Sequence, residues 1–414
     1  MKLLLVNAYF YPENIAFSHL ERDILNGLIA KGHEISVVCP VPCRGISEEI
    51  IREYHGKKRE KHNGICIHRY WAPREGSNPL NRAFRYFWCN LRGNSAGRRF
   101  RDTDLIFAVS TPPTQGYFAG KLAKKLGVPL VYSLQDVFPD SLVTTGLTSK
   151  GSWLFRIGAR LERKTYALCA RIIVPSKTIE ANLREKGVDS GRLLTVSNWI
   201  DTDEVRPVPR RENRLFEEFG IDRERFTVVY AGNFGASQNT EIILEAARAL
   251  ADEPDIQFVL FGSGAEFESA MKETAAAGSG NIVMNPLLPP DRISEVYSMG
   301  DVALITCKRG VGKAAMPSKL WSIMACDTPI IASFDTDSEL SGILAEAGAG
   351  ICVEPEDPEA LTRAIKEAYL NRSSPRSHTA RAYVATHAAK DACVKKYVAC
   401  IEAASSGTGR EGTA

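Results

Sequence analysis

The sequence of 414 residues contains no long hydrophobic run. No stretch approaches the roughly 18 consecutive apolar residues that a membrane-spanning helix requires. The apolar run Leu3–Val6 is too short to be the core of a secretory signal. We therefore expect a cytoplasmic protein. The net charge is also small, at +3, so bulk charge gives no indication of a nucleic-acid partner.

The sequence also lacks a paired metal-binding motif. Ten cysteines are present, but none belongs to a C-x-x-C pair, and no Cys/His cluster has a second half at zinc spacing. Asp335 and Asp337 lie close together and are interpreted as a loop residue and a helix cap. We therefore expect reduced thiols and no metal site.

Strand-like and helical segments alternate in two successive halves of the chain, which predicts two α/β domains with parallel sheets covered on both faces. The strands expected in the first half are Lys2–Val6, Glu34–Cys39, Ile65–Tyr70, Leu105–Val109, Pro129–Leu134, Ile172–Val174 and Leu193–Val196. Those expected in the second half are Thr227–Tyr230, Gln257–Phe261, Ile282–Met284, Val302–Ile305 and Ile330–Ser333.

The segment Arg206–Arg211 contains two prolines and three arginines, which is typical of a solvated, semi-rigid connector. We place the domain boundary there, so that residues 1–205 and 206–380 form the two domains. Residues 381–404 are expected to form a helix that packs back toward the first domain. Residues 405–414 are expected to be a disordered tail. Ligands of open α/β sheets bind beyond the carboxyl ends of the strands, so we expect a ligand in the cleft between the domains.

Two glycine turns follow expected strands in the second half. Gly232–Gly235 precedes a helix expected over 239–251, and Gly262 and Gly264 follow the next strand. Glycines at such points allow tight turning and close approach of the backbone to an anion. A phosphate-binding turn and a plain strand-to-helix turn both remain open for each of them.

The segment Cys307–Lys319 is rich in basic residues and follows another expected strand. Arg309, Lys313 and Lys319 could contact a diphosphate at the carboxyl end of that strand. Ser318 precedes an expected helix and could offer its hydroxyl to the same anion. A solvated basic surface is the alternative interpretation.

The motifs together resemble the retaining glycosyltransferases of family 4, also called group 1, and most of all bacterial members that assemble O-antigen, capsule or exopolysaccharide. The resemblance covers about residues 2–400 and depends on the order and spacing of short motifs. These motifs are Lys31–Glu34, Ser110–Pro113, Leu134–Asp140, Val174–Ser176, Ser197–Asp201, Gly232–Gly235 with Gln238, and Pro317–Lys319 leading to Met324.

The resemblance implies a GT-B fold, in which two Rossmann-like doubly wound domains face a central cleft. It implies transfer from a nucleotide-sugar, by family habit a UDP-sugar, with retention of configuration and no metal cofactor. The implied acceptor is a growing glycan linked to polyprenyl diphosphate. The implied donor-binding residues are Gly232, Asn233, Phe234, Gly235, Gln238, Gly262, Gly264, Arg309, Lys313, Ser318 and Lys319.

The sequence departs from the family pattern at several positions. Ala314 and Ser322 occupy the two positions at which many members carry glutamate, so the roles of those carboxylates do not transfer. Asn233 and Gln238 replace the usual arginine and lysine after the glycine turn. We expect the basic segment described above to supply the lost positive charge.

The residues for acceptor-side chemistry are sought in the first half. Asp136 follows an expected strand and is the main catalytic candidate, with a turn or cap residue as the alternative. Glu13 and His19 follow the first strand and are further catalytic candidates, although a structural role is the common one for a histidine early in a helix.

Residues 79–101 mix aromatic residues with arginines. A basic helix with bulky apolar residues can lie on an anionic membrane surface, which favours peripheral membrane association. The alternative is a helix that packs on the sheet and exposes a solvated basic face.

Two other functions remain open. A GT-B sugar-nucleotide 2-epimerase would convert its substrate without an acceptor. A non-catalytic protein that binds a nucleotide-sugar is consistent with the missing glutamate pair. Neither glycine turn matches G-x-G-x-x-G at the first strand, which disfavours a nicotinamide oxidoreductase.

Overall fold

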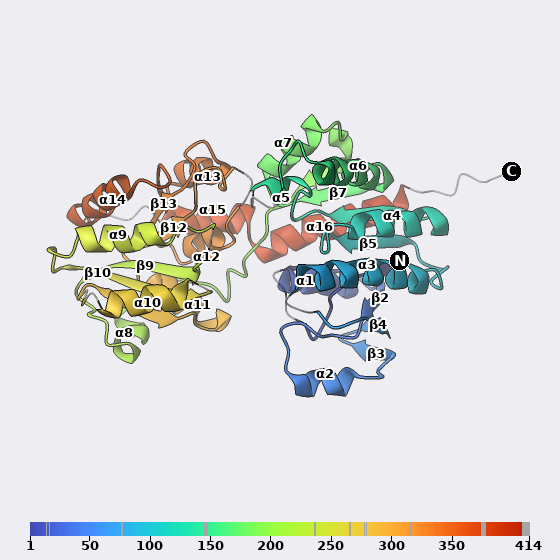
Figure 1. The fold of residues 1–414 in the computed structure, drawn as a ribbon, viewed down its shortest axis with the longest axis horizontal. Helices are drawn as coiled ribbons and strands as arrows, with labels where there is room; N and C mark the ends of the chain where they lie inside the picture. Colours follow the sequence, from blue (N-terminus) through green and yellow to red (C-terminus); the bar gives the residue numbers. More distant parts are fainter. Residues whose placement is uncertain are drawn as a thin grey trace. The chain divides into compact units, whose positions relative to one another are not determined.

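The computed structural model describes residues 1–13, 15, 17–75, 78–144, 148–235, 237–264, 266–276, 278, 280–313, 316–373 and 378–407. The chain divides into two units: residues 1–197 together with the segment from Cys393 onward, and residues 198–392. Each unit is a largely parallel sheet with helices on both faces (Figure 1).

The sheet of the first unit has the strand order β3-β4-β2-β1-β5-β6-β7-β8, and β3 pairs antiparallel with β4 at its edge. The strands are β1 (Lys2–Val6), β2 (Glu34–Pro40), β3 (Arg59–His62), β4 (Ile65–Tyr70), β5 (Leu105–Val109), β6 (Leu130–Ser133), β7 (Arg171–Val174) and β8 (Leu193–Thr195). The order reverses between β1 and β5. Every residue of the apolar strand β5 is buried, as expected for a parallel strand covered on both faces.

One face of this sheet is covered by α3 (Pro79–Gly97), α4 (Gln115–Leu126) and α6 (Trp153–Leu168), and α4 contacts both of its neighbours. On another side, α1 (Ser18–Ala30) packs against α16 (Lys390–Ser406), where a Cβ on Gly27 would lie 2.7 Å from the Val394 side chain. The remaining helices of this unit are α2 (Glu48–Tyr54), α5 (Asp140–Thr144), α7 (Lys177–Glu185) and a 3-10 turn at Ser190–Arg192.

The sheet of the second unit has the strand order β11-β10-β9-β12-β13-β14, and all pairs are parallel. The strands are β9 (Phe226–Asn233), β10 (Ile256–Ser263), β11 (Ile282–Pro286), β12 (Val302–Thr306), β13 (Ile330–Ser333) and β14 (Gly350–Val353). The order reverses between β9 and β12, which is the point at which doubly wound sheets bind their ligands.

Two apolar cores flank this second sheet. One contains α9 (Glu241–Ala249), α10 (Phe267–Ala276) and α14 (Pro358–Leu370), and α9 and α14 lie side by side (Figure 1). The other contains α8 (Leu215–Glu218), α11 (Ile293–Ser298), α12 (Lys319–Ala325), α13 (Glu339–Ala347) and α15 (Thr379–His387). Short 3-10 turns lie at Arg210–Glu212 and Pro290–Arg292.

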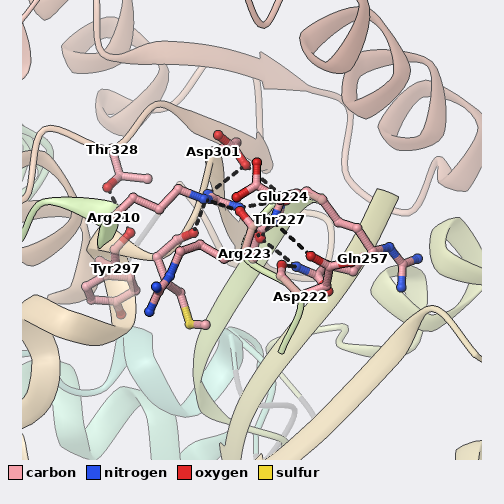
Figure 2. Close-up of polar contacts among 11 residues, drawn as sticks. Arg210, Asp222, Arg223, Glu224, Thr227, Gln257, Tyr297, Asp301 and Thr328 are labelled. Atoms are coloured by element: carbon pink, nitrogen blue, oxygen red, sulfur yellow. Dashed lines mark hydrogen bonds and ion pairs between the residues drawn. The ribbon is translucent and has the colours of Figure 1, made fainter. Parts of the chain in front are cut away.

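The predicted domain boundary at residue 206 is too late, because the connector is anchored to the second unit. The backbone N–H groups of Arg206 and Val208 donate to Ser294 and Ser298 of α11, at 3.2 and 3.0 Å. The Arg210 guanidinium donates to the carbonyls of Arg223, Arg225 and Met299 at 2.7, 2.6 and 3.1 Å, and pairs with Asp301 at 3.1 Å (Figure 2). The segment is therefore an ordered part of the second unit.

Replacing Arg210 by alanine should lower the free energy of unfolding of the second unit by about 2–3 kcal/mol, because three carbonyls and a carboxylate lose one shared donor. Urea unfolding measures this loss. The control is Arg211→Ala, whose side chain is 86% exposed and pairs only with the neighbouring Glu212, so that the change should stay within about 0.5 kcal/mol. Equal losses in both variants would contradict the anchoring role.

The predicted helix over residues 381–404 is two helices. The chain is interrupted at Ala389, which pairs with Ile200 in an isolated bridge. The Arg381 guanidinium, on α15, donates to the carbonyls of Thr202, Val205 and Ala325, so α15 belongs to the second unit. From Cys393, α16 packs on the first unit, where the Tyr397 hydroxyl lies 3.1 Å from the Ser133 hydroxyl. Ser405 and Ser406 are helical rather than disordered, and 408–414 lie outside the described residues.

Two strands were not predicted from the sequence. β3 is a polar edge strand, and β14 is only partly buried, so neither has the continuous apolar run of the inner strands. By contrast, the bounds predicted for β1, β4, β5 and β13 are confirmed. Among the described helices, none is long and apolar enough to cross a membrane.

Candidate functional site

The candidate site lies at the carboxyl ends of β9 and β12, where the strand order of the second sheet reverses. The loop that follows β9 is attached to the end of β12. The Thr306 hydroxyl donates to the Gln238 carbonyl at 2.6 Å, and the Lys308 N–H donates to the Ser237 carbonyl at 3.0 Å. The glycine turn and the basic segment, predicted separately from the sequence, therefore lie next to each other.

Lys319, the first residue of α12, places its ammonium group against this turn. Its Nζ lies 3.9 Å from the centroid of the Tyr230 ring. A Cβ added to Gly232 would lie 2.5 Å from that nitrogen and 3.2 Å from Lys319 Cε, so a larger residue would displace the end of the lysine side chain. Gly232 therefore allows the close approach of the lysine.

The Lys319 ammonium has no acidic partner among the described residues. Burial lowers its pKa to about 7, and no neighbouring charge contributes to the shift. A buried cation without a counter-charge is unfavourable in the unliganded protein, and an anion beside it would relieve that cost. This combination favours a site for a negatively charged ligand.

The Asn233 side chain joins the two glycine turns. A Cβ on Gly235 would lie 2.5 Å from Asn233 Nδ2, and a Cβ on Gly264 would lie 2.3 Å from Asn233 Oδ1. Gly264 also has a φ of +110°, which favours glycine. Gln238 approaches the same turn, with its Oε1 3.2 Å from the position of a Gly235 Cβ. The structure therefore brings these predicted residues together with Gly232 and Lys319.

Phe234 and Gly262 belong to the core instead. The Phe234 ring is 1% exposed and packs edge to face with the ring of Phe267, at 5.1 Å between centroids. A Cβ on Gly262 would lie 2.2 Å from the Phe267 ring and 2.7 Å from the Phe234 ring. The Phe234 side chain is therefore part of the core, and Gly262 gives room for the packing of two aromatic rings. That these two residues contact the donor stays a prediction.

Arg309 and Lys313 are paired with carboxylates and do not join Lys319. Arg309 forms an ion pair with Glu354 at 2.8 Å, and Lys313 forms one with Asp337 at 2.6 Å. Both basic side chains are 57% exposed, so each pair is weak. Their predicted contribution to the donor site is not supported by these contacts. Ser318 is exposed immediately before α12.

Asp335 is a buried carboxylate that holds the basic loop. It accepts hydrogen bonds from the backbone N–H groups of Gly310 and Gly312, each at 2.9 Å. The N-cap of α13 is Ser338 rather than Asp337, the aspartate interpreted as a helix cap from the sequence. Within the described part of the chain, no group of three or more His, Cys, Asp or Glu residues could hold a metal ion. Ala314, one of the two positions without the family glutamate, lies outside the described residues.

The acceptor-side candidates belong to the first unit. Asp136 follows β6, and desolvation raises the pKa of its carboxyl. It lines a small cavity together with Glu162. Glu13 is 3% exposed, and its carboxylate accepts three backbone N–H groups, at 2.8 Å from Cys43, 2.9 Å from Arg44 and 3.3 Å from Phe10. These contacts make Glu13 a structural clamp. His19 is exposed in the first turn of α1.

Glu21 is a buried acidic residue that the sequence interpretation missed. It lines a cavity with Asn7 and Thr111, beyond β1 and β5, where the strand order of the first sheet reverses. Asn7 Nδ2 donates to its carboxylate at 2.5 Å, and burial raises its pKa to about 7. The available signal was its position on the same helical face as Leu25 and Leu28.

Comparison with known proteins assigns the family. Residues 22–199 match the glycosyl transferase 4-like domain family, and residues 211–385 match the family of glycosyl transferases group 1. A Pseudomonas aeruginosa protein named "Probable glycosyltransferase WbjE" is 30% identical over 325 residues, which cover 78% of this chain and 80% of that protein. The chain belongs to the glycosyltransferases, with a glycosyl transferase 4-like domain followed by a group 1 domain.

Other relatives agree with this assignment. WcaI of Escherichia coli (strain K12), whose name refers to colanic acid biosynthesis and glycosyl transfer, is 27% identical over 414 aligned residues, covering 96% of this chain and 99% of that protein. Among solved structures, HepE of Anabaena in complex with UDP has a TM-score of 0.70 at 13% identity, covering 97% and 100% of the two chains. Sucrose-phosphate synthase of Thermosynechococcus elongatus has a TM-score of 0.73 at 15% identity, covering 98% and 100%.

The fold of this glycosyltransferase is GT-B, an α/β fold with two Rossmann-like units, as predicted. The predicted enzyme class is confirmed as far as glycosyl transfer. Retention of configuration and transfer of a hexose stay predictions. The joint placement of donor and acceptor in one cleft stays a prediction.

Proposed function

We propose that this enzyme transfers a sugar from a UDP-sugar to a growing, polyprenyl-diphosphate-linked glycan, with retention of configuration, during the synthesis of a cell-surface polysaccharide. The observation that carries the proposal is the Lys319 ammonium beside Gly232 at the strand-order reversal, which is half-buried and has no acidic partner among the described residues. The choice of uridine is supported by HepE, which has been solved with UDP and UDP-glucose. The polysaccharide role is supported by the names of WcaI and of WaaG, which acts in lipopolysaccharide biosynthesis.

In the proposed reaction, negative charge develops on the diphosphate as the bond to the sugar breaks. A fixed cation at that point stabilises the transition state without reorganisation. Lys319 supplies this charge, and the glycine turns after β9 and β10 let the backbone approach the diphosphate closely. Asp136 is the acceptor-side residue that we propose for positioning or deprotonating the acceptor hydroxyl, because desolvation raises the pKa of its carboxyl.

Thermal unfolding in the presence of nucleoside diphosphates tests the donor site directly. A ligand at 100 times its dissociation constant adds about 2.7 kcal/mol to the free energy of unfolding. We expect UDP to raise the melting temperature more than ADP or GDP at equal concentration. If no nucleoside diphosphate stabilises the protein, the proposed donor site is wrong. Turnover of a UDP-sugar without an acceptor would instead indicate the epimerase.

We also propose that the enzyme binds peripherally to an anionic membrane. The predicted segment 79–101 forms α3, which exposes Phe84, Phe87 and Leu91. On the same face of the first sheet, α6 exposes Trp153 and Ile157, at 72% and 51%. The helices α3, α4 and α6 contain no carboxylate except Glu162, which is buried and paired with Lys186 at 2.8 Å. A layer with aromatic residues, cations and no exposed acid is suited to anionic lipid.

The double charge reversal Arg156→Glu/Arg160→Glu should reduce binding to vesicles of phosphatidylcholine with 30% phosphatidylglycerol by about tenfold or more, since each lost cation removes about 1 kcal/mol of attraction. Co-sedimentation measures the bound fraction. The matched control is Lys272→Glu/Arg363→Glu, which reverses two exposed cations of the second unit. Equal binding of wild-type enzyme to vesicles with and without phosphatidylglycerol would rule out this membrane surface.

A further inference from the structure

A cavity in the first unit has no part in the donor site. It is a groove of about 780 Å³. Its walls come from the loop after β2, the helix α2, the β3–β4 hairpin and the carboxyl-terminal half of α3. Its lining includes residues 41–43, which follow β2, and Trp71, Ala72 and Arg74, which follow β4. It therefore opens at the carboxyl edge of the sheet, where α/β sheets bind ligands.

The groove is strongly basic. None of its described lining residues is acidic, and the cations come from both walls. Lys58 and Arg59 approach from the start of β3, and Arg92 and Arg99 from α3 and the turn after it. All four side chains are exposed, and among the described residues none forms an ion pair with a carboxylate. Four uncompensated cations around one groove attract a multiply charged anion.

Three further cations that line the groove are already paired. Lys57 pairs with Glu53 at 2.9 Å, Arg74 pairs with Glu48 at 2.9 Å, and Arg69 pairs with Glu60. Each of these carboxylates lies outside the lining. The charge available to a ligand is therefore concentrated on the four unpaired residues.

The groove also has an apolar side. Tyr70, Trp71 and Phe100 line it, and the Trp71 side chain is 63% exposed. The Trp71 ring packs edge to face against Trp88 of α3, at 5.6 Å between centroids, and the Trp88 Nε1 donates to the Trp71 carbonyl at 3.1 Å. The aromatic surface is thus held in place without being covered, beside the unpaired cations.

We propose that this groove binds a diphosphate ester of an apolar alcohol. The diphosphate lies between Lys58 and Arg59 on one wall and Arg92 and Arg99 on the other, where guanidinium groups can donate paired hydrogen bonds to phosphate oxygens. The apolar chain lies on Trp71 and Phe100. The inference rests on the proposed function, because an acceptor linked to a lipid diphosphate combines a diphosphate with an apolar chain. The groove would hold that acceptor on the first unit.

Isothermal titration of the full chain with geranyl diphosphate and with inorganic pyrophosphate tests the groove. We expect both to bind and geranyl diphosphate to bind more tightly, because it alone can contact the aromatic side. Arg92→Gln/Arg99→Gln should weaken both ligands by about tenfold or more. The matched control is Arg98→Gln/Arg101→Gln, which removes the same charge from exposed neighbours that do not line the groove, and it should change affinity by less than about twofold.

Two further variants test the β3 wall and the aromatic side of the groove separately. Lys58→Gln/Arg59→Gln should weaken both ligands, whereas Lys61→Gln, an exposed cation of β3 that does not line the groove, should not. Trp71→Ser should remove the preference for geranyl diphosphate and leave pyrophosphate binding unchanged. Equal losses for the Arg92/Arg99 and Arg98/Arg101 pairs would overturn the proposal, because they would show a non-specific charge effect. Losses confined to binding of phosphatidylglycerol vesicles would assign these residues to the membrane surface and would also overturn it.

UDP binding keeps this test independent of the donor site. Every variant of the groove should bind UDP with unchanged affinity, which also shows that it is folded. A protein that binds UDP and not geranyl diphosphate would refute the groove and leave the proposed function standing. A protein that binds geranyl diphosphate and not UDP would support the groove and refute the proposed donor site.

Discussion

Replacement of Lys319 by methionine is expected to reduce sugar transfer by roughly 100- to 1,000-fold, the cost of removing one preorganised group that stabilises transition-state charge. The free energy of unfolding should be unchanged or higher. Methionine preserves most of the length of the side chain and its contact with the Tyr230 ring, while it removes a charge that burial disfavours. Initial rates and urea unfolding of the same preparations measure the two effects.

The opposite signs of these effects distinguish a functional lysine from a structural one. Lys272→Met, at an exposed position of α10 in the same unit, is the control and should change neither quantity. A Lys319→Met enzyme with the wild-type rate would remove Lys319 from the site. A large loss of stability would instead show that its contacts with Gly232 and Tyr230 hold the unit together.

The second large effect is the uptake of a proton when UDP binds. Burial holds the pKa of Lys319 at about 7 in the unliganded enzyme, so the amine is mostly neutral at pH 8.5. A bound diphosphate favours the ammonium form and raises this pKa. UDP binding at pH 8.5 should therefore take up close to one proton, and affinity should fall by up to about tenfold for each pH unit above pH 7.

Titration calorimetry in buffers of different ionisation enthalpy measures the proton uptake, and Lys319→Met should abolish it. A heat of binding that is independent of the buffer in the wild-type enzyme would contradict the assignment.

The pH dependence of the stability of the unliganded protein supplies a second test. In the unfolded chain the lysine has its ordinary pKa of 10.5, so between about pH 7 and 10.5 the unfolded state binds more protons. Stability from this group therefore rises with pH across that window, and the rise should be missing in Lys319→Met.

The local rules that the sequence carries were sufficient for most of the fold. The apolar runs of β1, β5 and β13 have the bounds predicted for them, because a parallel strand covered on both faces is apolar along most of its length. The bounds of β4 were also predicted, although it alternates buried and more exposed residues. The polar edge strand β3 has no such signature and was missed. Gly235 and Gly264, which follow β9 and β10, were also found from the local sequence, whereas Gly232 and Gly262 belong to the ends of the strands themselves.

The ion-pair and hydrogen-bond partners of the basic residues are distant in the chain and could not be predicted from the local sequence. The basic segment 307–319 was predicted to supply several cations to one site, but the acidic partners of Arg309 and Lys313 come from other loops of the sheet. The connector containing Arg210 was predicted to be solvated, whereas the carbonyls that accept its hydrogen bonds belong to the segments just before β9 and β12. A cluster of charged residues in the sequence does not indicate which distant groups will pair with those charges in the folded protein.

The sequence by itself determined two parallel sheets, the glycine turns at their carboxyl edges and the presence of a basic segment beside them, because each of these follows from side-chain periodicity or backbone conformation within a few residues. Only the tertiary structure decided which cation stays unpaired and buried. Burial and counter-charge depend on groups that are distant in the chain, such as Gly232 and Tyr230 around Lys319. The same reason explains why the basic groove of the first unit, assembled from α2, β3, β4 and α3, became visible only in the folded protein.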